Sequence, residues 1–335
     1  MAEHKVRRME GSPADGQSPL YNGEDMDYRE IIGNVVLNTE DYPGRDLYSD
    51  GEIEDVLLDI AMNTDPADFD RVVEERKNWP VMYHFSSIRT NIMSWMPITK
   101  DMKVLEIGSG CGAITGTIAQ KAGSVTCVEL SRKRSLINAY RNREKDNIEI
   151  RLGNFEDVEK KLDTDYDMIT LIGVFEYAQG YISSADPYHD FLSIILRHLK
   201  PGGQLVMAIE NRLGMKYFAG ATEDHSGQYF EGMEGYSDTS RARTFAKPEL
   251  EEILSGCGLS DYTFYYPYPD YKFPMSIYSD YYLPKRGELR TNLANFDRER
   301  LILFDETQAF DSLVDSGLFP LFANSFLVVA RGGKA

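Results

Sequence analysis

Cysteine is scarce in this sequence: its 335 residues include three, Cys111, Cys127 and Cys257, and no two of them have the spacing of a metal-binding pair. A disulfide scaffold and a zinc ribbon are therefore excluded, and the chain suits a reducing cytoplasm. Also missing are an apolar run of the roughly 18 residues that cross a bilayer and the apolar stretch of a secretory signal. We expect a cytoplasmic protein without a membrane span.

Basic residues are outnumbered by acidic ones. Lys and Arg number 36 against 54 Asp and Glu, which gives a formal net charge of −18. A nucleic-acid binder needs a basic face that displaces counterions from phosphates, so we expect no nucleic-acid partner. The acidity is concentrated, because residues 21–75 hold 17 acidic side chains, three Arg and no Lys. This stretch is either a solvated, partly helical cover or a docking surface for a basic protein partner.

The N-terminal third of the chain divides into two parts. Residues 1–20 are polar and rich in Gly, Pro and Ser, which predicts a disordered tail. Residues 21–98 are expected to form the acidic region and then a helical cap. In the cap, apolar residues at helical spacing predict a stripe that faces the core. The stripe consists of Met82, Phe85, Ile88, Ile92 and Trp95.

Short apolar strands alternate with helices in the rest of the chain, residues 99–335. The first five strands are expected at 103–107, 124–129, 148–152, 166–173 and 204–210. This alternation implies parallel pairing through right-handed crossovers, which is an α/β fold with a doubly wound sheet. Strands at 262–269 and 325–332 make the sheet seven-stranded and mostly parallel. Insertions after the fifth and sixth strands, at 211–246 and 270–324, are long enough to be functional or disordered.

The strongest chemical signal is a glycine-rich turn after the first strand, Glu106-Ile-Gly108-Ser109-Gly110-Cys-Gly112. Glycines let the backbone turn tightly and approach a ligand at the carboxyl end of a strand. Glu129 ends the second strand, where a carboxylate can accept hydrogen bonds from two ribose hydroxyls. Taken alone, these features also fit a nicotinamide dinucleotide.

Three further features favour a different cofactor. The carboxylate of Glu106 would repel a pyrophosphate but suits a cationic ligand. Asn154 and Phe155 follow the third strand, where an adenine would lie, and the sequence Leu-Lys-Pro-Gly-Gly at 199–203 precedes the fifth strand. Together with the glycine turn, these residues resemble the class I S-adenosylmethionine-dependent methyltransferases over residues 100–210. The resemblance implies a Rossmann-like methyltransferase domain at 99–335, with S-adenosylmethionine as its cofactor.

The resemblance also implies where the cofactor binds. The glycine turn would hold the methionine part, the end of the second strand the ribose, the residues after the third strand the adenine, and those after the fourth strand the methyl end. From the helical cap, an arginine can pair with the cofactor's carboxylate. The expected cofactor-binding residues are Glu106, Gly108, Ser109, Gly110, Gly112, Glu129, Leu130, Asn154, Phe155, Gly173, Val174 and Arg89.

A hydroxyl acceptor needs a base, and histidine is the first candidate near neutral pH. His225 lies in the insertion after the fifth strand, beside Glu223 and Asp224, and is the expected catalytic residue; a surface histidine is the competing interpretation. Other residues expected to meet the acceptor are Tyr83, His84, Glu176, Tyr177, Glu210, Asn211 and Tyr217. No HxxxH or paired-cysteine spacing is present, so no metal is expected.

Three segments, at 78–89, 210–236 and 266–284, resemble a bacterial subgroup associated with surface-polysaccharide biosynthesis. That resemblance implies a sugar or another small-molecule or glycan acceptor, methylated on a hydroxyl. Two alternatives stay open. One is an NAD-dependent oxidoreductase on the same doubly wound sheet, and the other is a non-catalytic cofactor-binding module that meets a partner through its acidic face.

Overall fold

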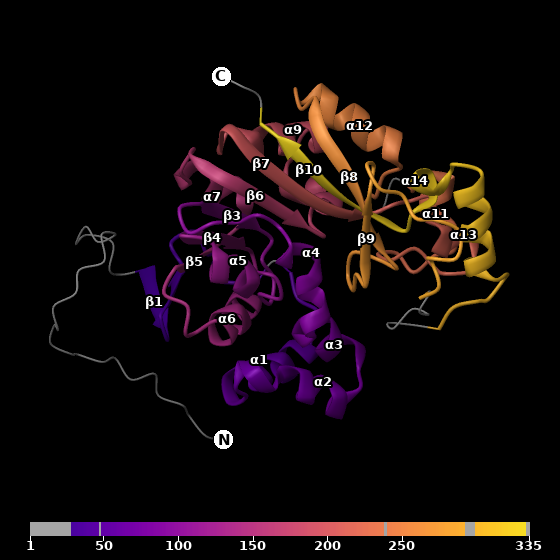
Figure 1. Cartoon of the computed structure of the whole chain (residues 1–335). Helices are drawn as coiled ribbons and strands as arrows, with labels where there is room; N and C mark the ends of the chain where they lie inside the picture. The colour runs from indigo at the N-terminus through magenta and orange to yellow at the C-terminus, as the bar shows by residue number, and fades with distance from the viewer. Residues whose placement is uncertain (1–27, 47, 238–239, 292–298, 333–335) are drawn as a thin grey trace, which may run out of the picture.

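The computed structural model describes residues 28–46, 48–237, 240–291 and 299–332, so the tail expected at 1–20 lies outside the described residues. The described strands form one ten-stranded sheet with helices on both faces (Figure 1). Its strand order is β1-β2-β5-β4-β3-β6-β7-β10-β8-β9. The strands are β1 Arg29–Ile32, β2 Val35–Asn38, β3 Lys103–Ile107, β4 Ser124–Glu129, β5 Ile148–Leu152, β6 Tyr166–Ile172, β7 Leu199–Glu210, β8 Asp261–Tyr268, β9 Ser276–Ser279 and β10 Ser325–Arg331.

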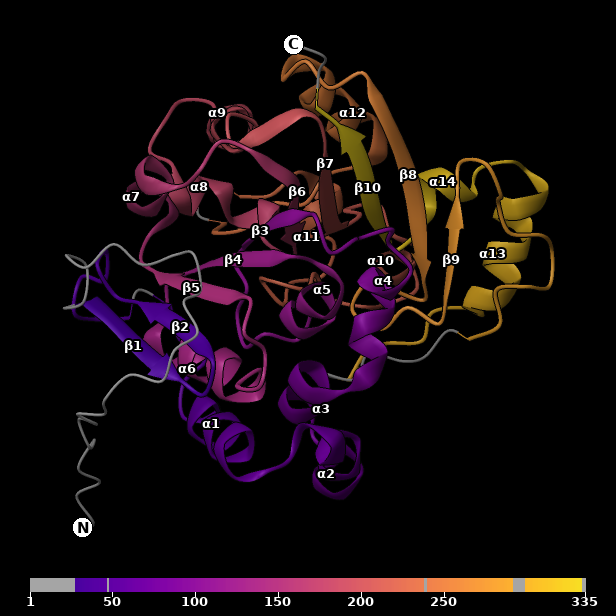
Figure 2. The same ribbon diagram turned by 60° about the vertical axis from the view of Figure 1, so that its left-hand side comes forward.

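In the described part of the chain, the helices lie between β2 and β10 in sequence (Figure 2). The α-helices are α1 Ile53–Asn63, α2 Phe69–Arg76, α3 Trp79–Phe85, α4 Asn91–Ser94, α5 Thr115–Lys121, α6 Arg132–Arg141, α7 Phe155–Val158, α8 Ala178–Tyr181, α9 Pro187–Leu196, α10 Met215–Phe218, α11 Glu231–Glu234, α12 Lys247–Gly256, α13 Glu306–Asp315 and α14 Phe319–Phe322. Short 3₁₀ helices are η2 Pro66–Asp68, η3 Ser87–Thr90, η4 Glu159–Lys161 and η5 Phe175–Tyr177. Within the described ranges, no helix has both the length and the apolar character to cross a membrane.

The seven strands expected from the sequence form the centre of the sheet, and the predicted doubly wound α/β fold is confirmed. Strands β5, β4, β3, β6 and β7 pair in parallel, while β10 lies antiparallel between β7 and β8. One face of the sheet packs on α7, α9 and α12, and the other packs on α4, α5 and α6. Because both faces are covered, the central strands are apolar throughout rather than alternating.

Three strands lie outside the predicted seven. The hairpin β1–β2 pairs with β5 and extends the sheet at one edge, and β9 pairs with β8 at the other. The hairpin turns at Gly33-Asn34, where Gly33 has φ +61°, the backbone that favours glycine. We expected a solvated, partly helical cover over residues 21–75, and this interpretation was wrong for 29–38. Acidic neighbours obscured a Gly-Asn turn between apolar residues, which is a hairpin signal.

The acidic N-terminal region packs against the basic start of α6. Asp46 accepts hydrogen bonds from the Ser131 hydroxyl and from the Arg132 backbone N–H, at 3.0 and 2.7 Å. Arg132 and Lys133 also pair with Glu30 and Asp55. Some of the acidic side chains of this region are therefore already paired with groups of the same chain. Docking of a basic partner on the remaining acidic side chains stays a prediction.

The predicted apolar stripe of the helical cap is only partly buried. Residues 79–94 form three short helices, α3, η3 and α4, instead of one, because Ser86 interrupts them with extended backbone. Phe85 and Ile92 are buried, but Ile88 and Trp95 are 38% and 41% exposed. The helical spacing therefore changes phase at Ser86, and the cap packs on the core through α3 and α4 separately.

Both long insertions end at the carboxyl edge of the parallel strands. Asn211, directly after β7, donates side-chain hydrogen bonds to the carbonyls of Leu321 and Ala323 in the second insertion, at 2.9 and 2.7 Å. Lys216 of the first insertion pairs with Asp270 of the second at 2.9 Å. The two insertions are thus tied together at the edge where ligands of doubly wound sheets bind.

Candidate active site

A cavity of about 970 Å³ opens at the carboxyl edge of the parallel strands, which is the upper end of the size range of ligand sites. The expected site residues on its wall are Tyr83, His84, Arg89, Glu106, Gly108, Ser109, Gly110, Glu129, Leu130, Asn154, Gly173, Val174, Glu176, Tyr177, Glu210 and His225. The structure therefore brings most of the predicted residues to one cavity.

The glycine turn forms one end of this cavity. Gly108, Gly110 and Gly112 all have positive φ, and a Cβ on Gly108 would lie 2.5 Å from a methyl carbon of Val174. No side chain fits between the turn and the residues after β6. The turn therefore exposes backbone rather than side chains to the cavity.

Glu129 fixes the conformation of that turn. One of its carboxylate oxygens accepts the backbone N–H of Gly110 at 2.8 Å. The other accepts the backbone N–H groups of Leu130 and Ser131 at 3.0 and 2.9 Å. The side chain is buried and lines the cavity, so it connects the ends of β3 and β4 besides facing the space in which a ribose is expected.

Glu106 lies beneath the turn and is also buried. Its carboxylate accepts a hydrogen bond from the Thr115 hydroxyl at 2.6 Å. Burial raises the pKa of Glu106 to about 7, against the opposing effect of the hydrogen bonds from Thr115 and Cys127. The group is therefore poised between its neutral and charged forms at physiological pH, so a cationic ligand group would favour its charged form.

Cationic groups line the same part of the cavity. The Arg89 guanidinium lies 4.3 Å over the Tyr83 ring and donates to the Lys272 carbonyl at 3.1 Å. Its Nε is buried and has no hydrogen-bond partner among the residues described, and the same holds for Nε of Arg134. Burial lowers the pKa of His84 well below its usual value, and the charges of Arg134 and Arg89 lower it further. His84 is therefore neutral beside two arginines.

Four expected site residues do not line the cavity. Phe155 is buried and packs edge-to-face on Phe191 at 5.2 Å, so its ring belongs to the core and not to the expected adenine site. The side-chain amide of Asn211 donates to the carbonyls of Leu321 and Ala323, so it connects the two insertions instead of facing the cavity. Tyr217 lies behind Asp224, to which its hydroxyl donates at 2.5 Å, and Gly112 packs against Asn138.

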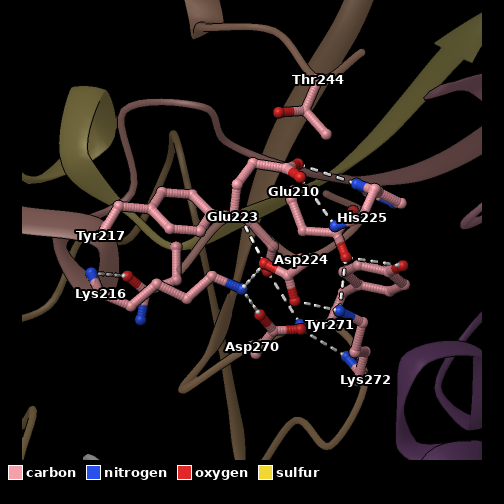
Figure 3. A network of polar contacts seen from close by, with 12 residues as sticks. Glu210, Lys216, Tyr217, Glu223, Asp224, His225, Thr244, Asp270, Tyr271 and Lys272 are labelled. Atoms are coloured by element: carbon pink, nitrogen blue, oxygen red, sulfur yellow. Dashed lines mark hydrogen bonds and ion pairs between the residues drawn. The ribbon is translucent and has the colours of Figure 1, made fainter. Parts of the chain in front are cut away.

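The other end of the cavity holds a buried network of charged side chains (Figure 3). Glu176 comes from η5, Glu210 ends β7, and His225 lies in the first insertion. His225 Nδ1 is 2.9 Å from Glu223 Oε1, and its Nε2 is 3.7 Å from Glu176 Oε1. The Tyr177 ring packs edge-on against the imidazole at 5.4 Å. His225 thus lines the cavity with its side chain 14% exposed, and its catalytic role stays a prediction.

Two lysines hold the carboxylates of this network. Lys272 contacts Glu210 and Asp224, both at 2.6 Å, and Lys216 contacts Asp224 and Asp270 at 2.8 and 2.9 Å. Burial raises the pKa of Asp224, but the charges of Lys216 and Lys272 outweigh it and hold that pKa well below its usual value. Burial would lower the pKa of His225, but its hydrogen bonds to Glu176 and Glu223 and the charge of Glu210 raise it well above normal.

Several cavity residues were not anticipated from the sequence. Tyr48 and Asp50 reach the wall from the acidic region, Arg134 from α6, and Tyr271 and Lys272 from the second insertion. The sequence carries only weak signals for them: Tyr271 lies in a stretch rich in Tyr, but nothing local distinguishes Arg134 from other helix-surface arginines. These residues come together only because distant segments meet at one sheet edge.

The fold and the site together define a doubly wound α/β enzyme domain with a small-molecule crevice at the ends of β3, β4 and β6. Residues 105–205, from β3 to β7, match the family model described as a methyltransferase domain. This part of the chain is therefore a methyltransferase domain, with S-adenosylmethionine as its cofactor, which agrees with the resemblance to the class I S-adenosylmethionine-dependent methyltransferases. The NAD-dependent alternative is thereby set aside. No curated protein matches the chain.

Solved structures resemble the chain at low identity. One is an S-adenosylmethionine-dependent methyltransferase of Thermotoga maritima, titled a possible histamine N-methyltransferase, with 16% identity, TM-score 0.44, and coverage of 80% of this chain and 99% of that one. Another is a methyltransferase of Archaeoglobus fulgidus, with 13% identity, TM-score 0.44, and coverage of 82% and 98%. A third is an O-methyltransferase family protein of Burkholderia thailandensis, with 10% identity, TM-score 0.44, and coverage of 81% and 62%. Likenesses of this strength say nothing about the acceptor.

The glycine turn yields the first test. We expect Gly110→Val to abolish S-adenosylhomocysteine binding in a folded protein. Residue 110 has φ +52°, and a Cβ there would lie 3.2 Å from the Arg134 guanidinium, so valine would disturb both the backbone and the cavity wall. Calorimetry measures the affinity. Gly317→Val is the matched control, since Gly317 has φ +70° and open space around it. Unchanged affinity in a folded Gly110→Val protein would contradict the assignment.

Glu106 yields a pH prediction. If its carboxylate pairs with the ammonium group of the cofactor, the charged form must bind, and this form predominates above the raised pKa of about 7. Affinity for S-adenosylhomocysteine should therefore rise by roughly tenfold from pH 6 to pH 8, following the ionised fraction. Titration calorimetry across this range checks the prediction. Glu106→Gln should bind more weakly and without this rise, and a rise that survives in Glu106→Gln would assign it to another group.

Proposed function

We propose that this methyltransferase methylates a hydroxyl group of a sugar or of another small or glycan acceptor, in the cytoplasm. One observation carries the proposal: a single cavity has the glycine turn at one end and Glu176, Glu210 and His225 at the other. A cofactor held at the turn and an acceptor held at the charged network would share one enclosed space, as in-line transfer requires.

The residues at the turn fit S-adenosylmethionine, which supplies its methyl group from a sulfonium. Glu106 is placed to pair with the ammonium of the methionine part, and Glu129 to accept from the ribose hydroxyls. The buried, unsatisfied Nε atoms of Arg89 and Arg134 provide donors for the carboxylate. Asn154 is placed on the wall for the adenine edge, and Gly173 and Val174 for the methyl end.

The proposed acceptor end combines aromatic rings with hydrogen-bond acceptors, and a sugar needs both. Tyr83, Tyr177 and Tyr271 place aromatic faces on the cavity wall, and Glu176 and Glu210 place hydrogen-bond acceptors there. Aromatic rings cover the apolar faces of a sugar while carboxylates accept from its hydroxyls. The resemblance to a subgroup associated with surface polysaccharides supports the same class of acceptor.

His225 is the residue that we propose acts on the acceptor hydroxyl. Its side chain is 14% exposed, and its neighbours Glu176, Glu210 and Glu223 are all carboxylates. These carboxylates favour the charged imidazole, so the proton on Nε2 must leave before that nitrogen can engage a hydroxyl or any other ligand.

Methyl transfer to fractionated cell extract tests the function. The full chain is incubated with S-adenosylmethionine labelled in its methyl group, and the labelled product is analysed for acid-stable methyl ethers. Uptake into a small molecule or glycan fraction as a methyl ether supports the proposal. Label recovered as a methylamine or in protein would overturn it, and a folded protein that binds the cofactor but labels no fraction would favour a non-catalytic module.

His225→Ala should lower turnover on the acceptor by roughly 10²–10⁴-fold and leave cofactor affinity within twofold. His189→Ala is the control, because His189 also contacts a carboxylate, Asp186 at 2.9 Å, but does not line the cavity. Single-turnover rates and melting temperatures are measured on both variants. Full turnover in a folded His225→Ala protein would show that the acceptor is activated elsewhere.

A further inference from the structure

Three side chains at the acceptor end are arranged as a ligand set. Glu176, Glu210 and His225 each offer one ligand atom, and these atoms all lie within 4.8 Å of one another. They come from η5, from the end of β7 and from the first insertion, which are three segments at one sheet edge. Each lines the cavity, so a ligand bound between them would be open to the acceptor.

The imidazole of His225 is held in the orientation of a ligand. Its Nδ1 is paired with Glu223, and Glu223 is itself fixed by the backbone N–H groups of His225 and Ser226 at 2.8 and 2.7 Å. This leaves Nε2 facing Glu176. A metal-binding histidine almost always donates its other ring N–H to a carboxylate or carbonyl in this way, which fixes the tautomer and the ring.

Both carboxylates keep an unused oxygen. Glu176 and Glu210 are 1% and 0% exposed, yet Oε2 of each has no hydrogen-bond partner in the part of the chain that the structure describes. A buried carboxylate oxygen without a partner is costly, because it has lost water and gained nothing in return. Both carboxylates, each of which has an oxygen within 4.8 Å of a ring nitrogen of His225, therefore keep a capacity to bind a cation that no described residue uses.

The net charge of the network also favours a bound cation. Its five carboxylates, Glu176, Glu210, Glu223, Asp224 and Asp270, face two lysines and one histidine, so when all of these groups are ionised the network has an excess of two negative charges. Lys216 and Lys272 already contact Asp224, Asp270 and Glu210, and neither is in an ion pair with Glu176 in the described ranges. Burying this excess without a further cation is unfavourable.

We infer that Glu176, Glu210 and His225 bind a divalent cation at the acceptor end of the cavity. Two carboxylate oxygens and one imidazole nitrogen suit Mn²⁺ or a similar ion, because carboxylates favour hard cations and imidazole the transition metals. The absence of a metal-binding spacing in the sequence is no obstacle, since the three ligands are far apart in the chain. Lys272 and Tyr271, both in contact with Glu210, would orient that carboxylate.

The inference rests on the proposed function for the place of the acceptor, and it gives His225 the role of ligand instead of base. A hydroxyl coordinated to a divalent cation has a lower pKa, as bound water does. Its O–H bond would break more readily, with the proton passing to water. The oxygen would then form a bond to the methyl carbon while the methyl–sulfur bond of the cofactor breaks, and the electron pair of that bond would go to the sulfur, which leaves as S-adenosylhomocysteine. No basic side chain is then required at the hydroxyl.

Direct ion binding tests the site without any acceptor. The full chain is stripped with a chelator, and Mn²⁺ is added while electron paramagnetic resonance reports the free ion. We expect one ion per chain, with Glu176→Gln, Glu210→Gln and His225→Ala each lowering affinity at least 100-fold. Glu223→Gln, which removes only the support of the ring, should lower affinity roughly 10–100-fold. His189→Ala should bind as the unaltered chain does.

The possible results separate this inference from the proposed function. Folded, chelator-treated protein that leaves Mn²⁺, Mg²⁺ and Zn²⁺ free at millimolar concentration would overturn the inference, as would variants that bind Mn²⁺ unchanged. Methyl-ether formation that persists in the metal-free chain would leave the proposed function standing without the ion. Specific Mn²⁺ binding without methyl transfer to any fraction would uphold the site and refute the proposed acceptor.

Discussion

The carboxylate of Glu129 is the interaction on which the cofactor end of the cavity depends. It accepts three backbone N–H groups, one from the glycine turn and two from the residues that follow β4. Those donors have no strand partners at this edge, so the side chain replaces the sheet's own hydrogen bonds where the strands end. Because β3 and β4 are thereby joined, the turn is held open before any ligand arrives. Pre-formed sites of this kind lose less entropy on binding.

At the proposed acceptor end, the cavity wall is held together by ion pairs between side chains instead of by hydrogen bonds to the backbone. Its lysines and carboxylates come from both insertions, and ion pairs between Lys216, Lys272, Asp224 and Asp270 connect them. Buried pairs of this kind add little net stability, but removing one partner costs about 3–5 kcal/mol because the other charge is left buried. The network therefore fixes the insertions in one arrangement. It also leaves the free carboxylate oxygens of Glu176 and Glu210 in a defined place.

Much of the fold and half of the site follow from local sequence. Four of the five parallel strands lie within one residue of their predicted bounds, because apolar runs bounded by turns are typical of strands covered on both faces. The fifth, β7, begins at Leu199, five residues before the expected start. Glu106, the glycine turn and Glu129 occupy strand ends, where side-chain position follows from the strand itself. Phe155 shows the limit of such reasoning: it starts a one-turn helix after β5, and only packing against Phe191 decides that its ring points to the core.

The sequence by itself determined the doubly wound sheet and the glycine turn at its ligand-binding edge, since each depends on residues that are neighbours along the chain. Only the tertiary structure decided which further residues line the cavity. Arg89 meets the carbonyl of Lys272 across 183 positions, and Glu176, Glu210 and His225 converge from three segments. The β1–β2 hairpin likewise exists because β5 offers it an edge. Contacts of this kind depend on how the insertions pack at the ends of the strands, and the periodicity of a single segment carries no information about that packing.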